Sequence, residues 1–157
     1  MESETIKPFQ MNFQTKNMTE TYLNGLVKSI ELPKIHDPRG NISVVEKNII
    51  PFDCKRVYYL YDVPSGATRG GHAHQEQLEI LIAVSGSFDV VLNDGQEQVK
   101  IHLNRPNFGL LIRQGVWREL ENFSSGSVCL VLASEIFEEA DYIRDFESFK
   151  SFKNRVS

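Results

Sequence analysis

The sequence predicts an all-β domain, a small antiparallel sandwich or barrel that ends in a short helix. Apolar and polar residues alternate in short runs rich in β-branched and aromatic residues, which is typical of half-buried strands. Turn-forming residues separate these runs, and no strand-to-helix alternation indicates a parallel sheet. The 157 residues, 41% hydrophobic and 24% charged, suit one domain with a sizeable core.

The first part of the chain differs from the rest. Residues 1–26 show no convincing hydrophobic periodicity, so we predict an N-terminal extension there and the folded domain over residues 27–157. The extension lacks the apolar segment of a signal peptide, and no apolar run approaches the roughly 20 residues needed to span a bilayer. The formal net charge of −4 offers no basic field for nucleic acid. We therefore expect a cytoplasmic protein without a membrane or nucleic-acid partner.

The two cysteines, Cys54 and Cys129, lie far apart in the sequence and outside any CxxC pair. A disulfide framework or a zinc knuckle is therefore not expected, which fits a reducing cytoplasm. We expect two small buried thiols.

About nine runs in the domain predict strands. Between the fifth and the sixth run, Asn93-Asp94-Gly95 supplies residues that tolerate positive φ and predicts a hairpin. In chain order, the runs are residues 26–32, 41–46, 55–61, 78–84, 87–92, 98–103, 108–112, 117–122 and 127–133.

The end of the chain has a different period. Tyr142, Phe146, Phe149 and Phe152 recur at steps of three or four residues. This spacing predicts a short amphipathic helix that closes the domain.

The most informative motif spans residues 66–86. It reads Gly66, five residues, His72-x-His74, four residues, Glu79, six residues and Gly86. This pattern resembles the first signature of the cupin superfamily with every position filled, which implies a jelly-roll β-barrel. The two imidazoles of HxH on a strand share one face, and in a small barrel that face can point into the mouth. The alternative is a pair of hydrogen-bonded histidines on a solvated face.

The second cupin signature is altered in this chain. The stretch 107–122 keeps Gly115 and Asn122, but Arg113 replaces the proline and Arg118 replaces the histidine that completes the metal site of many cupins. Arginine stays protonated and does not bind metals. We therefore expect no metal and no cofactor, and a cationic pocket that suits a phosphate or nucleotide.

Histidines in a metal-free pocket are natural general bases. Side chains alternate along the run 55–61, so Arg56 and Tyr58 share one face of that strand and Tyr59 and Tyr61 the other. A tyrosine hydroxyl in the pocket could donate to a developing enolate oxygen.

Several segments together resemble a known enzyme family. They are residues 55–95, which contain RVYY, RGGHAH and NDG, followed by VWREL (116–120), VLAS (131–134) and DYIRDFESF (141–149). The resemblance covers about residues 28–150 and is to the nucleotide-sugar 3,4-ketoisomerases of the cupin superfamily, the WxcM-like group.

This resemblance implies an isomerase that moves the ketone of dTDP-4-keto-6-deoxyglucose from C4 to C3. A base removes the C3 proton, an enediol forms, and a proton returns at C4. The family supplies dTDP-linked 3-amino sugars of the bacterial cell surface, needs no metal, and forms homodimers with exchanged strands. Two alternatives stay open, a metal-free nucleotide-sugar epimerase and a non-catalytic ligand-binding cupin.

The resemblance also assigns roles to individual positions. It implies that His72 is the base. One imidazole could serve both proton transfers, or two residues could divide them, with His74 or Tyr58 supplying the returning proton. Substrate-binding arginines are expected at four positions, Arg39, Arg56, Arg69 and Arg118. Axial-product and equatorial-product members differ at the positions of Arg39 and Arg118, and both configurations at C4 stay open because this chain has arginine at both.

Overall fold

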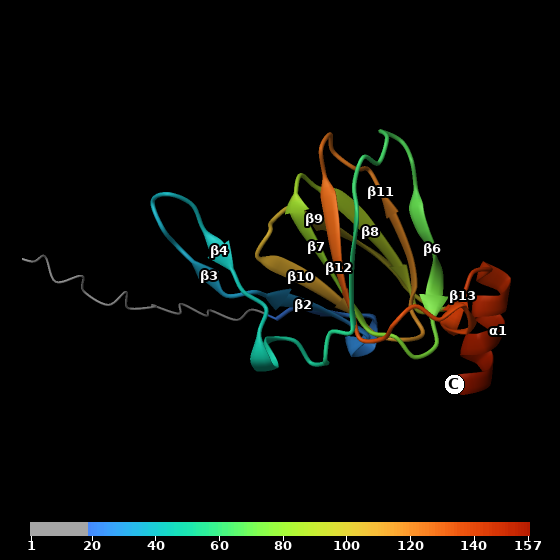
Figure 1. The fold of residues 1–157 in the computed structure, drawn as a ribbon. Coiled ribbons are helices and arrows are strands. Elements are labelled where there is room, and N and C mark those ends of the chain that lie inside the picture. Colours follow the sequence, from blue (N-terminus) through green and yellow to red (C-terminus); the bar gives the residue numbers. More distant parts are fainter. Residues whose placement is uncertain (1–18) are drawn as a thin grey trace, which may run out of the picture.

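Two large antiparallel sheets face each other in the computed structural model, which describes residues 19–157 (Figure 1). A two-stranded hairpin stands off one side of this sandwich, and one helix packs at the other side. The predicted all-β jelly roll with a short C-terminal helix is confirmed, although the two sheets do not close into a continuous barrel.

The first sheet has six strands. Their order is β1 (Thr21–Tyr22), β2 (Val27–Glu31), β10 (Phe108–Ile112), β7 (Glu79–Ser85), β12 (Val128–Ala133) and β5 (Arg56–Leu60). The second sheet has five strands, in the order β13 (Tyr142–Ile143), β6 (Arg69–His74), β11 (Trp117–Glu121), β8 (Phe88–Asn93) and β9 (Gln98–Leu103).

The remaining elements are short. The projecting hairpin pairs β3 (Lys34–Ile35) with β4 (Ile42–Ser43). Single 3-10 turns lie at η1 (Leu23–Gly25), η2 (Lys47–Ile49) and η3 (Glu139–Asp141), and the only α-helix of the described residues is α1 (Phe146–Val156).

Each of the nine predicted runs contains a strand. Most bounds agree within one residue, but the run 41–46 keeps only the two residues of β4. The predicted hairpin is confirmed, since β8 pairs with β9 from Asn93 and Gln98 and Gly95 has φ of 100°. The runs did not include β6, because Gly70 and Gly71 interrupt its pattern.

The core lies between the two sheets. Alternate residues of β8, Phe88, Val90 and Leu92, point into it and are fully buried, as expected for a strand with one solvated face. Strand β7 is buried along both faces, because a second apolar cluster that includes Ile50 and Ile80 covers the outer side of the first sheet. This double burial makes β7 a rigid support for the side chains at its start.

Helix α1 begins later than the aromatic spacing predicted. Asp145 caps it by accepting a hydrogen bond from the backbone N–H of Ser148 at 2.8 Å. Phe149 is fully buried against Trp117. Tyr142 lies before the cap, in β13, where it pairs with His74, so its assignment to the helical pattern was wrong.

Residues 1–18 of the predicted N-terminal extension lie outside the described residues. Thr21 and Tyr22 pair with β2 and so extend the first sheet. Both cysteines are free: Cys129 is buried as expected, but Cys54 is exposed because it lies in the irregular segment that leads to the edge strand β5. Within residues 19–157 no helix is long and apolar enough to cross a membrane.

Gly70 and Gly71, the second and third residues of β6, offer a test of its packing. Gly70 and Gly71 have φ of +83° and +75°, and a Cβ on Gly70 would lie 2.9 Å from the carbonyl oxygen of Arg118, whereas a Cβ on Gly71 would meet nothing within 4 Å. We expect Gly71→Ala to lower the free energy of unfolding by about 1–2 kcal/mol, because alanine is strained in the left-handed backbone conformation. Gly70→Ala should lower it by about 2–4 kcal/mol, because overpacking against Arg118 adds to that strain. Urea unfolding of both variants measures the difference, and equal costs would contradict the predicted clash.

Candidate active site

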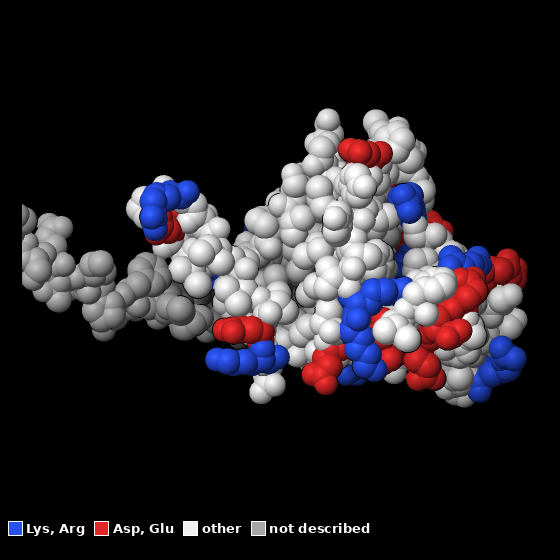
Figure 2. Space-filling model, in the orientation of Figure 1, with Lys and Arg blue, Asp and Glu red and all other residues white. Residues whose placement is uncertain are grey.

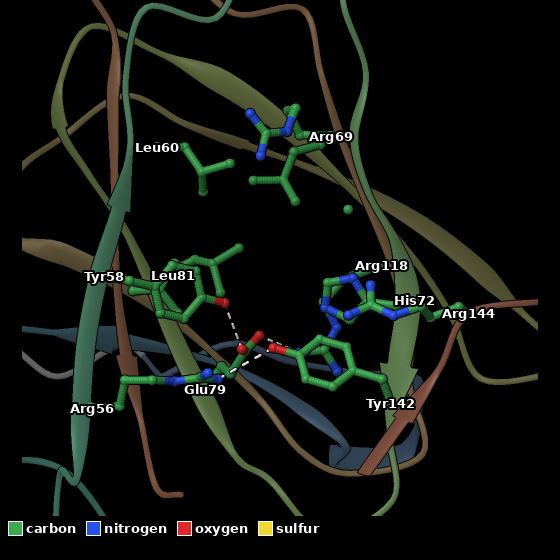
Figure 3. Close-up of a pocket in the computed structure, with 13 residues that line it drawn as sticks. Arg56, Tyr58, Leu60, Arg69, His72, Glu79, Leu81, Arg118, Tyr142 and Arg144 are labelled. Atoms are coloured by element: carbon green, nitrogen blue, oxygen red, sulfur yellow. Dashed lines mark hydrogen bonds and ion pairs between the residues drawn. The ribbon is translucent and has the colours of Figure 1, made fainter. Parts of the chain in front are cut away.

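A cavity of about 320 Å³ opens between the two sheets (Figure 3). Strands β5, β7 and β12 line it from one side, and β6, β11 and β13 from the other. Its polar lining consists of four arginines, two tyrosines, one histidine and one glutamate: Arg56, Arg69, Arg118, Arg144, Tyr58, Tyr142, His72 and Glu79. Leucine and valine side chains fill the remaining wall, so the charged groups act in a partly dry space.

His72 lines this cavity. Its Nε2 atom is buried and has no hydrogen-bond partner. Burial, the nearby charge of Arg118 and the neighbouring His74 lower the pKa of His72 to about 3. The imidazole is therefore neutral at physiological pH, with a lone pair available to take a proton.

Glu79 is the buried anionic centre of the site. Its carboxylate accepts hydrogen bonds from Tyr58 Oη at 2.7 Å, from Gln77 Nε2 at 2.7 Å and from Arg118 Nη1 at 2.5 Å. Burial alone would raise the pKa of Glu79, but the Arg118 charge and the hydrogen bonds outweigh it and hold that pKa well below its ordinary value. Glu79 is thus ionised and fully paired.

Arg118 occupies the position where many cupins carry a third metal-binding histidine. It is 1% exposed, and besides Glu79 it donates to the carbonyl oxygen of Val116 at 2.9 Å. The donor atoms of His72, His74 and Glu79 lie within 4.8 Å of one another, as a metal set would require. The guanidinium, however, takes up a Glu79 oxygen and adds a fixed positive charge, so this set does not fit a divalent cation.

Tyr58 projects from β5 into the cavity with Arg56, and Tyr59 and Tyr61 point away, as the strand pattern predicted. Burial and the adjacent Glu79 charge raise the pKa of Tyr58 far above its ordinary value. Its hydroxyl therefore stays protonated and acts as a hydrogen-bond donor.

The two histidines of the HxH motif are not equivalent. His74 is fully buried behind the cavity wall, with Nδ1 at 2.8 Å from Asp141 Oδ2 and Nε2 at 3.3 Å from Glu79 Oε1. The rings of His72 and His74 meet edge to face, with centroids 4.9 Å apart. Only His72 lines the cavity; the other imidazole supports it from behind.

The predicted arginines are placed differently from one another. Arg69 is exposed at the mouth of the cavity, and Arg56 donates to the side chains of Gln77 and Tyr142 at its base. Arg39 is not at the cavity of this chain: it lies in the loop between β3 and β4, where its side chain is 91% exposed and paired with Asp37 at 2.9 Å.

Several residues of the site had not been predicted. Tyr142 and Arg144 lie one above the other on the cavity wall, with the guanidinium 4.2 Å from the ring centroid. Their alternation in Asp-Tyr-Ile-Arg was a signal for a strand, but the aromatic steps that follow hid it. Asp141 carries no local signal, because its partners lie 65–67 residues away along the chain. Gln77 lies within three residues of His74 and Glu79, but its residue type gave no sign of a role there.

Comparisons with known proteins agree on one family. A family model described as FdtA, WxcM-like, C-terminal, matches residues 26–154. The TDP-4-oxo-6-deoxy-alpha-D-glucose-3,4-oxoisomerase of Aneurinibacillus thermoaerophilus is 40% identical over 131 residues, which cover 83% of this chain and 94% of that protein.

Two solved structures are similar along nearly their whole length. A 3,4-ketoisomerase from Helicobacter canadensis is 44% identical with a TM-score of 0.79, covering 82% of this chain and 97% of its own. A variant of the 3,4-ketoisomerase QdtA from Thermoanaerobacterium thermosaccharolyticum, in complex with TDP-4-keto-6-deoxyglucose, is 39% identical with a TM-score of 0.81, covering 83% and 95%.

Proposed function

The chain belongs to the FdtA family of WxcM-like proteins, and from this premise we propose that it is an isomerase that converts TDP-4-keto-6-deoxyglucose to a TDP-3-keto-6-deoxyhexose. The observation that supports this reaction most directly is His72, an imidazole that lines an arginine-rich cavity and stays neutral because its pKa is lowered to about 3. Isomerisation of a ketone needs a base of this kind and no oxidant.

The reaction moves one carbon-bound proton and one oxygen-bound proton. The C4 ketone makes the C3 hydrogen acidic, and the unprotonated nitrogen of the His72 imidazole takes that proton to leave an enediolate. The C4 oxygen gains a proton, the C3 hydroxyl loses one, and the proton held on His72 returns to C4. His72 ends neutral, so the cycle closes without any other reactant.

The tyrosine hydroxyls and arginines of the cavity fit the remaining tasks. Tyr58 keeps its proton and donates a hydrogen bond to Glu79 in the free protein. With substrate bound, the hydroxyl can turn from Glu79 and donate to the enediolate oxygen, while Arg118 still neutralises the Glu79 carboxylate. Arg69 at the mouth is suited to a diphosphate, because a guanidinium can bind phosphate through two parallel hydrogen bonds.

We also propose that the protein acts as a homodimer in which the β3–β4 hairpin of one subunit carries Arg39 to the cavity of the other. The hairpin projects from the sandwich. The edge strand β5 exposes Val57 and Tyr59, and Tyr61 follows directly after it; the three side chains are 57–60% exposed. In Figure 2 the central face of the sandwich, where β12 lies in Figure 1, carries few charged side chains, whereas charges gather around α1. An apolar edge of this kind favours pairing with a second copy.

The resemblance to the nucleotide-sugar 3,4-ketoisomerases also supports a proposal about where the reaction occurs and what its product is used for. We propose that it takes place in the cytoplasm and contributes deoxysugars to cell-surface polysaccharide.

One assay tests the proposed reaction. Purified protein with EDTA is incubated with TDP-4-keto-6-deoxyglucose in deuterated buffer and followed by NMR. We expect the ketone to move from C4 to C3, with deuterium at C4 to the extent that the proton held on His72 exchanges with solvent before it returns. The rate should stay within about twofold of that without EDTA, because Arg118 excludes a divalent cation. The coupling of the C4 hydrogen in ordinary water gives the product configuration.

Other outcomes of this assay would overturn the proposal. Unchanged substrate, while a family relative converts it, would exclude the isomerase. An inverted C5 with the ketone still at C4 would indicate an epimerase, and tight binding without deuterium exchange would indicate a binding protein.

A further inference from the structure

Asp141 connects the segment before β13 to the buried histidine of the site. Its Oδ2 lies 2.8 Å from Nδ1 of His74, and its Oδ1 accepts the backbone N–H groups of Gln75 and Glu76 at 3.1 and 2.7 Å. The carboxylate is 12% exposed and does not line the cavity. Asp141 can therefore affect the cavity only through its contact with the His74 imidazole.

The opposite side of His74 indicates which nitrogen carries the proton. Oε1 of Gln77 accepts from Nη2 of Arg56 at 3.0 Å, which turns the amide nitrogen of Gln77 toward Glu79 at 2.7 Å and His74 Nε2 at 3.3 Å. Nε2 of His74 also lies 3.3 Å from Oε1 of Glu79, but that oxygen already accepts shorter hydrogen bonds, at 2.7 Å each, from Tyr58 and Gln77. An amide nitrogen only donates, so we assign its second hydrogen to a lone pair on Nε2. Nδ1 is then the protonated nitrogen, and it donates to Asp141.

We propose that Asp141 is a positioning residue of the isomerase: it fixes the tautomer and ring plane of His74, which in turn orients the base. The His74 ring packs edge to face against His72 and Tyr142, with ring centroids 4.9 and 4.4 Å apart. A change in the plane of the His74 ring would therefore shift both neighbouring rings. Because a catalytic base must be held within a fraction of an ångström of its productive position, a misplaced support lowers turnover. This role rests on the proposed function.

The variant Asp141→Asn separates orientation from folding. The amide oxygen of the new side chain can still accept the two backbone N–H groups, but its amide nitrogen then faces Nδ1 of His74 and offers a proton where the carboxylate accepted one. His74 can pair with it only as the opposite tautomer, protonated on Nε2. We expect kcat to fall about 100-fold, as when a partner that orients a histidine is lost, with KM within about threefold because Asp141 touches no substrate.

Two further measurements distinguish this role from a general structural one. In ¹⁵N NMR the proton on His74 should move from Nδ1 to Nε2 in Asp141→Asn, whereas the spectrum of the control Glu138→Gln should match that of the original protein. Glu138 is an exposed residue of the same segment, and its variant loses the same charge. We expect Glu138→Gln to keep kcat within about twofold.

A double-mutant cycle with His74→Asn tests the route of the effect. If Asp141 acts through His74, adding Asp141→Asn to His74→Asn should lower kcat by less than about twofold. The proposal fails if Asp141→Asn keeps kcat within about threefold, if it costs as much without His74, or if the tautomer does not change. An inactive original protein would refute the proposed function instead, and the tautomer measurement would still report on the contact between Asp141 and His74.

Discussion

Replacing His72 by asparagine is expected to lower kcat for ketone transfer by about 10⁴-fold, the effect of removing a catalytic base. Asparagine has a similar size but cannot accept a proton from carbon, so C3 deprotonation stops while the cavity keeps its shape. Turnover followed by NMR should be lost together with exchange of the C3 hydrogen into deuterated solvent. Binding of the TDP-sugar by calorimetry should stay within about threefold.

The same substitution elsewhere supplies the control. His102 on β9 lies outside the cavity lining, exposed and 2.6 Å from Asp89, so His102→Asn should leave kcat within about twofold.

The pKa of His72 is lowered to about 3, so the base is already deprotonated across the physiological range. The kcat/KM of the original protein should therefore show no acidic step near pH 6.5, the ordinary histidine value, from about pH 6 to 8. A step there would mean that another group is the base or that His72 is more solvated.

Removing the charge of Arg118 is expected to have the largest effect on stability. In Arg118→Met the Glu79 carboxylate remains buried, 1% exposed, without its cationic partner. Breaking one side of a buried ion pair costs about 3–5 kcal/mol, because the remaining charge is left desolvated. Urea unfolding at neutral pH measures this loss.

The pH dependence of that loss has a definite sign. Without Arg118, burial dominates and raises the pKa of Glu79 above the value in the unfolded chain. The folded variant then binds more protons than its unfolded form, so its deficit in unfolding free energy should shrink as the pH falls toward that raised pKa and be full above it.

Two control variants test whether the loss of stability in Arg118→Met comes from the buried charge. Adding Glu79→Gln to Arg118→Met removes the stranded charge and should recover part of the stability. Lys55→Met breaks a surface pair with Glu135, whose partners are 52% and 44% exposed, and should cost less than about 1 kcal/mol. An Arg118→Met loss as small as that of Lys55→Met, or one that does not depend on pH, would contradict the buried-pair interpretation.

Much of the fold could be predicted because strands and turns have local signatures. The alternation of Phe88, Val90 and Leu92 and the turn at Gly95 depend only on near neighbours along the chain, and both are confirmed. The aromatic steps that end the chain were misleading at Tyr142. A spacing of four residues cannot distinguish a helical turn from a two-residue strand followed by a cap at Asp145.

By itself, the sequence determined the strand pattern, the cupin motif around His72 and His74, and the arginine in place of a metal-binding histidine, since each is carried by residue type and spacing within one segment. Only the tertiary structure decided that His72 faces the cavity while His74 is buried behind it. The buried ring is held by Asp141, 67 residues away from His74 along the chain, which the pairing of β13 with β6 brings into contact. Likewise, the β5–β12–β7 pairing brings Tyr58 to Glu79, and the contacts of the base thus depend on strand order rather than on any local pattern.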